Sequence, residues 1–158
     1  MVQDTLMKWQ SREVRPGLTV DIPADAPPAV FGGADAGNFI AGDELIHVGI
    51  FWGPGEDLSL WRANMAKVQG RTFGAETSGT VCGRPARRME VTVPGHSAHF
   101  SGGTSGEGYS VTPTKVLVFF AFELGATPVV VYFSAPSDER ERYLADELHF
   151  LTSIKCSP

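Results

Sequence analysis

The stretch "KVLVFFAFELGATPVVVYF", residues 115–133, constrains the fold more than any other part of the sequence. It holds two apolar segments of strand length, joined by a turn that runs from Gly125 to Pro128. Because side chains alternate between the two faces of a strand, segments that are apolar at nearly every position present hydrophobic surface on both faces. We therefore expect two central strands in a sheet that is covered on both sides.

Other segments supply further strands for this sheet. "REVRPGLTVDIP" places a Pro16-Gly17 turn between two extended stretches and predicts an N-terminal hairpin. "TFGAETSGTVCG" and "PARRMEVTVPG" predict a second hairpin that turns near Gly83. "LIHVGIFW", residues 45–52, is apolar on both faces and predicts one more covered strand. Hairpin connections indicate that the sheet is antiparallel.

Two helices are expected to cover it. Asp57 is a suitable N-cap for a helix that ends near Gly70. Its apolar positions are Leu58, Trp61, Met65 and Val68. In the last segment, "SDERERYLADELHFLTSIK", Ser137 is a suitable N-cap and Lys155 suits the helix end. The apolar stripe expected for this helix consists of Leu144, Leu148, Leu151 and Ile154.

Two stretches rich in glycine and small residues are expected to be irregular loops, "ADAPPAVFGGADAGN" and "SGGTSGEG", residues 101–108. With 158 residues, of which 42% are hydrophobic and 20% charged, the chain fits one domain over residues 1–158. The order of elements predicts an α+β fold, an antiparallel β-sheet flanked by helices on both faces.

This order resembles the PsbP-like α/β/α sandwich, which is shared by PsbP, Mog-type Ran-binding proteins, LpqN-type lipoproteins and effector-associated secretion chaperones. The resemblance lies in the opening "LTVDIP" strand, in "GRPARRMEV" as a strand pair about a glycine turn, and in "TPVVVYFSAPSDERERYLADELHFLTSI" as last strand and last helix. It implies a non-catalytic binding or assembly module, with no catalytic residue to transfer.

Charge and hydropathy exclude some partners. A net charge of −5, with lysine and arginine dispersed along the chain, gives no footprint for nucleic acid. The longest apolar run, residues 116–122, is too short to cross a bilayer, and the first ten residues do not have the pattern of a signal peptide. We expect no membrane insertion. The compartment stays open, since a removed signal peptide leaves no trace.

The two cysteines, Cys82 and Cys156, lack the paired spacing of a structural zinc site. Two interpretations stand side by side. They form one long-range disulfide in an oxidising compartment, or they are two small residues in a reduced protein. The pair slightly favours a cell-envelope or secreted location over the cytoplasm.

The segment "VPGHSAH" places Ser97 where a hydrolase would put its nucleophile, but His99 occupies the position of the second glycine that a nucleophile elbow needs. His96 and His99, three residues apart in an expected loop, lack the rigid geometry of a metal site. We therefore expect no catalytic residue, no metal and no cofactor. Trp9, His96 and His99 are instead candidate interface residues.

The sequence thus favours a binding or adaptor domain that holds a protein partner, in the cell envelope or as a secretion-associated chaperone. A small-ligand carrier with a pocket between sheet and helix is the first alternative. A serine hydrolase that uses Ser97 is the second.

Overall fold

A computed structural model describes residues 5–25, 29–33, 35–43, 46–102 and 106–157, with the backbone alone for 29–31, 97–102 and 106–110. In chain order the elements are β1 (Trp9–Arg15), β2 (Leu18–Pro23), β3 (Ala29–Gly32), β4 (Gly37–Gly42), β5 (His47–Trp52), α1 (Leu58–Met65), β6 (Thr72–Phe73), β7 (Thr77–Val81), β8 (Arg84–Val93), β9 (His96–Gly102), β10 (Gly106–Thr112), β11 (Lys115–Leu124), β12 (Thr127–Pro136), the 3-10 turns η2 (Ser137–Glu139) and η3 (Glu141–Tyr143), α2 (Leu144–Ser153) and β13 (Lys155–Cys156).

The main sheet has the order β3-β4-β5-β12-β11-β8-β6, and β7 pairs with the first half of β8. All its neighbouring strands are antiparallel. The two most apolar strands, β11 and β12, are central, and they pair along their whole length from Lys115↔Pro136 to Leu124↔Thr127. The sequence prediction for the centre of the sheet is confirmed.

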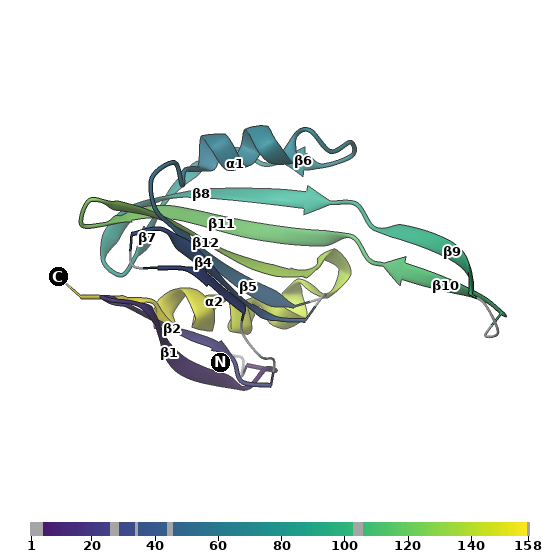
Figure 1. Cartoon of the computed structure of the whole chain (residues 1–158), viewed down its shortest axis with the longest axis horizontal. Coiled ribbons are helices and arrows are strands. Elements are labelled where there is room, and N and C mark those ends of the chain that lie inside the picture. The colour runs from purple at the N-terminus through teal and green to yellow at the C-terminus, as the bar shows by residue number, and fades with distance from the viewer. Residues whose placement is uncertain (1–4, 26–28, 34, 44–45, 103–105, 158) are drawn as a thin grey trace.

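Each face of the sheet has its own hydrophobic core, and Figure 1 shows α1 over one face and α2 over the other. On one face α1 contributes Leu58 and Met65 to a core with Phe119 and Tyr132. On the other face α2 and the β1–β2 hairpin lie side by side, and Phe150 packs with Leu18 and other buried residues. Each face thus has one short helix and no complete helical layer, since α1 has 8 residues, α2 has 10, and a hairpin shares the cover of the second face.

The start of α1 is as predicted. The Asp57 side chain accepts a hydrogen bond from the Leu60 amide at 2.8 Å, which satisfies one of the free N–H groups at a helix start. The helix ends earlier than expected, at Met65, and Val68 lies beyond it with half of its surface exposed. Val68 is therefore not a core position.

The expected apolar stripe of α2 is wrong in two of its four positions. Leu144 and Leu148 are 43% and 62% exposed, whereas Asp146 and Phe150 are fully buried. The cause is a contact that lies far away in the sequence. The Asp146 carboxylate accepts hydrogen bonds at 3.0 Å from the amides of residues 6 and 7 and from the indole N–H of Trp9. Burial of a carboxylate is tolerated because it is hydrogen-bonded, and it turns the helix so that the two leucines face solvent.

Two further predictions near the ends of elements are corrected. The last helix begins at Leu144 and not after Ser137, since η2 and η3 come first, and Lys155 lies in β13. The first expected loop contains β3 and the start of β4, paired from Ala29↔Ile40 to Gly32↔Gly37. Within the described ranges, no helix is both long and apolar enough to cross a membrane.

Candidate binding site

Strands β9 and β10 form a projecting arm (Figure 1). They pair with each other as a separate two-stranded sheet, from Thr112↔His96 to Gly106↔Gly102. No third strand of the described chain pairs with either of them, so both outer edges of the ribbon are open. The second expected loop, residues 101–108, therefore belongs largely to this arm, and residues 103–105 lie outside the described residues.

The arm continues the ladder between β8 and β11. That ladder ends at Lys115↔Val93, and extending its register through residues 94 and 95 leads to the arm pair Thr112↔His96. Pro94 and Pro113 have no amide N–H, which explains why the ladder is interrupted there. At the same joint a Cβ on Gly95 would lie 2.4 Å from the Thr112 carbonyl oxygen, so only glycine fits.

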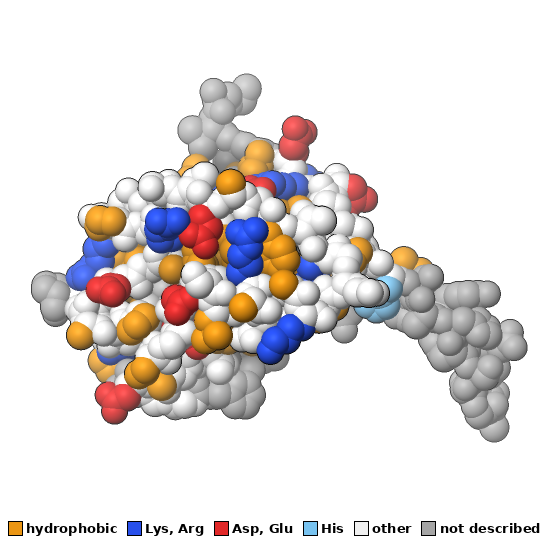
Figure 2. All heavy atoms as spheres, turned by 90° about the horizontal axis from the view of Figure 1, so that it is seen from above, with side chains coloured by type: hydrophobic (Ala, Val, Ile, Leu, Met, Phe, Trp, Pro, Cys, Tyr) orange, Lys and Arg blue, Asp and Glu red, His pale blue; other side chains and the backbone are white. Residues whose placement is uncertain are grey.

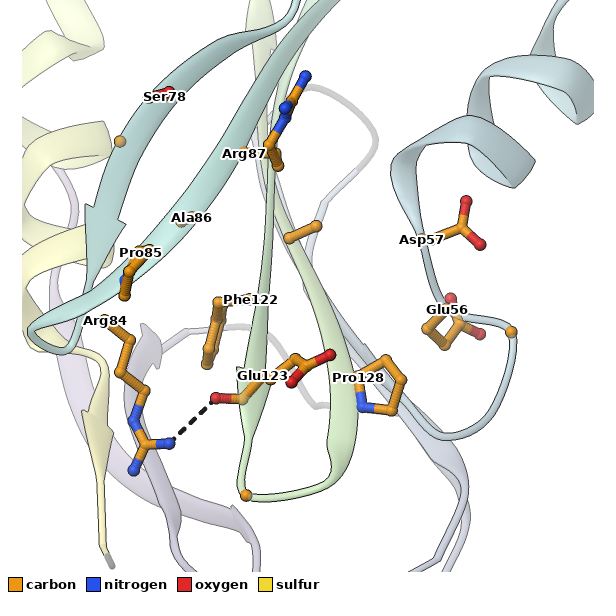
Figure 3. Close-up of a pocket in the computed structure, with 14 residues that line it drawn as sticks. Glu56, Asp57, Ser78, Arg84, Pro85, Ala86, Arg87, Phe122, Glu123 and Pro128 are labelled. Carbon is orange, nitrogen blue, oxygen red and sulfur yellow. Dashed lines mark hydrogen bonds between the residues drawn. The ribbon is translucent and has the colours of Figure 1, made fainter.

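A cleft of about 710 Å³ lies at the opposite end of β8 and β11 (Figure 3). Pairing between these strands stops at Ala121↔Arg87, although β11 continues to Leu124 and β8 begins at Arg84. The two strands thus separate over three residues on each side. The cleft is lined by both separated strand ends, by Ser78 and Gly79 of β7, by residues 55–57 before α1, and by Gly125 and Pro128.

A disulfide lies beside the cleft. Cys82 and Gly83 form the two-residue turn between β7 and β8, with φ of 44° and 74°, and Cys82 is bonded to Cys156. Cys156 lies in β13, which pairs with β2 of the N-terminal hairpin. The disulfide therefore ties this turn to the second, smaller sheet.

The cleft carries both charges on opposite walls (Figure 3). On the β8 wall, the Arg84 Nη1 donates to the Glu123 carbonyl at 3.1 Å, and Arg87 forms an ion pair with Glu76 at 2.6 Å. Glu56, Asp57 and the exposed Glu123 side chain supply carboxylates on the other side. Because Arg87 is already paired with Glu76, the remaining carboxylates leave an excess of negative charge in the cleft.

A second cavity, of about 440 Å³, lies between α1 and the sheet. Phe51 of β5 and Trp61 of α1 line it and meet edge to face, with ring centroids 4.7 Å apart. The Trp61 indole donates to Glu56 at 2.8 Å. Seen from this side, basic, acidic and hydrophobic side chains are interspersed on the surface (Figure 2). This cavity has the location that the ligand-carrier interpretation requires.

An ionic network lies on the face that α2 covers. Glu90 accepts a hydrogen bond from Arg88 at 2.5 Å and two from Arg140, which joins β8 to the segment before α2. The hydrogen bond from Arg140 is the main reason why the pKa of Glu90 lies below its usual value. Burial raises the pKa of the nearby Glu147. The network connects elements of the fold.

The candidate interface residues lie in two different sheets, Trp9 in β1 and both histidines in β9. Trp9 is partly buried, donates to Asp146 and stacks on Phe150, with ring centroids 6.4 Å apart. His96 is exposed at the base of the arm. His99 lies within β9 opposite Tyr109, and of both residues only the backbone is described. Their assignment to an interface stays a prediction.

The Ser97 segment has a different backbone from the expected turn. Ser97 lies within β9 and pairs with Val111. A nucleophile elbow needs a sharp turn between a strand and a helix, and a residue inside an extended ribbon does not form one. In the described part of the chain, no three His, Cys, Asp or Glu side chains are grouped so that they could hold a metal ion.

Sequence reasoning missed the cleft and its residues Arg84, Phe122 and Glu123. One signal was present, because Pro85 stands inside an otherwise regular strand and has no N–H to extend a ladder. As a sequence pattern, the Gly83-Arg84-Pro85 stretch indicated only a turn. The sequence does not reveal the residue at which β11 stops pairing with β8, because this depends on the register of the two strands.

Comparison with solved structures gives full-length matches. Cyanobacterial PsbP (CyanoP) from Synechocystis sp. PCC 6803 matches with a TM-score of 0.57 and 11% identity, over 99% of this chain and 95% of that chain. LpqN, described as involved in cell envelope biogenesis of Mycobacterium tuberculosis, matches with a TM-score of 0.44 and 11% identity over the same shares. No protein-family model and no curated protein sequence matches. The chain has a PsbP-like fold, as the sequence predicted.

Proposed function

We propose that this protein is a non-catalytic binding protein of an extracytoplasmic compartment, and that its β9–β10 arm holds a protein partner by pairing with one of the partner's strands. The projecting two-stranded arm, with its two open edges, is the observation on which this proposal rests (Figure 1).

The arm has the properties of a strand acceptor. An isolated two-stranded ribbon is only marginally stable in water, so a third strand adds stability. Proteins use lysine, proline or a covering element to protect strand edges that must not pair with another chain. Between residues 96 and 112 there is no Lys, Arg or Pro, and Glu107 is the one acidic residue. Near the base Val111 is 74% exposed, the largest such value among the exposed large hydrophobic residues of the described chain. An edge of this kind suits β-strand addition.

The compartment and the absence of catalysis have separate support. The Cys82–Cys156 bond suits an oxidising compartment, in which disulfides form and persist. The extended backbone at Ser97 does not support the hydrolase alternative.

The test uses a photo-reactive amino acid in the living source organism. Placed at Val111 it is expected to cross-link one protein, whereas the same group at Leu60, exposed on α1, gives no such product. A second cross-linking group at position 96, exposed at the base of the arm, should capture the same protein. This capture should be lost in a variant in which an Asn-Gly turn joins residue 96 directly to Thr112 in place of residues 97–111, because these two residues are paired neighbours. Cross-linking of the same protein from Leu60, or unchanged capture by the short-arm variant, would contradict the proposal.

The cavity between α1 and the sheet favours a small-ligand carrier as the second candidate. Native mass spectrometry of protein from its own source tests this. A bound mass that Trp61→Ala releases would support the carrier, and an unliganded mass would not.

A further inference from the structure

The cleft exposes two facing strand edges. Antiparallel continuation of the β8–β11 ladder would pair Ala86 with Phe122 and Arg84 with Leu124, yet the ladder stops before both pairs. On its far side β11 is fully paired with β12, and β8 is paired with β7. Backbone groups alternate between the two sides of a strand, so part of those at residues 84–86 and 122–124 point into the gap.

The gap is wide enough that a side chain crosses it. The Arg84 guanidinium, and not a backbone amide of β8, donates to the Glu123 carbonyl (Figure 3). Strands in a regular pair lie about 4.8 Å apart, which leaves no room for a side chain between their backbones. In the continued register Pro85, which has no N–H, would lie opposite Glu123, so the arginine supplies the donor that the Glu123 carbonyl would otherwise lack.

The walls of the cleft select for shape and charge. Phe122, Ala86 and Pro128 provide apolar surface. The carboxylates of Glu56, Asp57 and Glu123 outnumber the arginines, one of which is neutralised by Glu76. An excess of negative charge in a partly enclosed space favours a cationic occupant.

We propose that the cleft binds an extended, positively charged segment of a protein partner, which lies as a short strand between β8 and β11. It runs antiparallel to one of them and parallel to the other, and its N–H groups replace the Arg84 guanidinium at the Glu123 carbonyl. This site does not depend on the arm, since the two lie at opposite ends of the molecule (Figure 1).

The probe is an acetylated and amidated pentapeptide, Thr-Lys-Val-Lys-Thr, titrated into the isotope-labelled full chain. We expect amide resonances to shift at residues 84–87 and 121–124. Two matched peptides separate the causes. Exchange of both lysines for glutamate tests charge, and N-methylation of the central valine removes one backbone donor. N-methylation is expected to weaken binding by about tenfold, the effect of losing one good hydrogen bond, and the lysine exchange, which reverses two charges, by more than that.

Two protein variants remove the same charge from the cleft. Arg84→Met and Arg87→Met should both strengthen binding of the cationic peptide, but Arg84→Met more, because only Arg84 occupies a carbonyl that the peptide needs. Glu123→Gln should weaken binding several-fold, and Glu13→Gln, exposed on β1, should leave it unchanged. Melting temperatures confirm that the variants fold.

Equal affinity of the N-methylated peptide, equal effects of the two arginine variants, or the lack of any shift in the cleft with millimolar peptide would overturn this proposal. The short-arm variant is expected to bind the peptide as the parent does. A negative cross-linking result at the arm would therefore not affect a positive peptide titration at the cleft. A negative titration would likewise not affect a positive cross-linking result.

Discussion

The two ends of the β8–β11 pair are held in opposite ways. At the arm, backbone pairing resumes in the same register beyond the interruption at Pro94 and Pro113, and no other strand of the described chain pairs with it. At the cleft, the ladder is missing, and the disulfide, β13 and the second core hold the strand ends instead. A strand end that loses its neighbour thus needs tertiary or covalent support, whereas a strand end that keeps its neighbour can leave the body of the protein.

The largest effect is expected where α2 supports the second core. Phe150 is fully buried between Trp9 and Phe133. Phe150→Ala should lower the free energy of unfolding by roughly 3–5 kcal/mol, because it leaves a cavity in a packed core. Leu148→Ala, on the same helix but 62% exposed, should change it by less than ~0.5 kcal/mol. Urea unfolding of both variants measures the contrast, and equal losses would mean that the helix is turned differently.

Loss of the disulfide tests the cleft end directly. Cys82 and Cys156 are 74 residues apart in sequence, and the chain-entropy model gives about 4 kcal/mol for closing a loop of this size. The double variant Cys82→Ser with Cys156→Ser should melt at a lower temperature, and amide exchange should accelerate at β7 and at the start of β8. Two free thiols in unreduced protein, or an unchanged melting temperature on reduction, would show that the bond does not form.

The contact between Asp146 and the N-terminal segment is expected to contribute less. Asp146→Asn keeps the shape of the side chain but puts an amide N–H opposite one of three donors. An unsatisfied buried group costs about 1–3 kcal/mol. The control is Asp138→Asn, at an exposed position of η2. The indole N–H resonance of Trp9 reports whether the segment detaches, and an unaltered resonance and stability would contradict the assigned contact.

At the arm end a smaller, pH-dependent effect is expected. Burial lowers the pKa of His47, at the start of β5, below its usual value of 6.5. The unfolded chain therefore takes up a proton first as the pH falls, so the free energy of unfolding should decrease below about pH 6.5. His47→Gln should reduce this dependence, whereas His96→Gln, at an exposed arm position, should not. Unfolding in urea at pH 5.5 and 7.5 distinguishes the two.

The predictable parts of the fold are those set by local pattern. Three features depend on residues that are close in sequence: the two hairpins, the strands β11 and β12 that are apolar on both faces, and the Asp57 cap. The start of α1 and the centre of the sheet could therefore be predicted without knowing any distant contact.

The parts that failed depend on distant partners. The buried face of α2 is chosen by Trp9 and by amides some 140 positions away, and a leucine stripe contains no information about them. The arm was missed because glycine and serine in residues 101–108 are typical of loops as well as of ribbon tips. The cleft exists because the β8–β11 pairing stops at Arg87 while the β7–β8 pairing continues to Arg84. These limits are defined only by the assembled sheet.

Because the arm extends a ladder that already exists, its reach can change without any change to the body of the protein. Deleting or inserting two residues in β9 together with two in β10 preserves which side chains point to which face, since side chains in a strand repeat every second residue. Each such step moves the tip by about 7 Å. Homologous proteins could therefore differ in the length of this ribbon in even steps and match partners of different depth, while the sheet, both cores and the cleft remain the same.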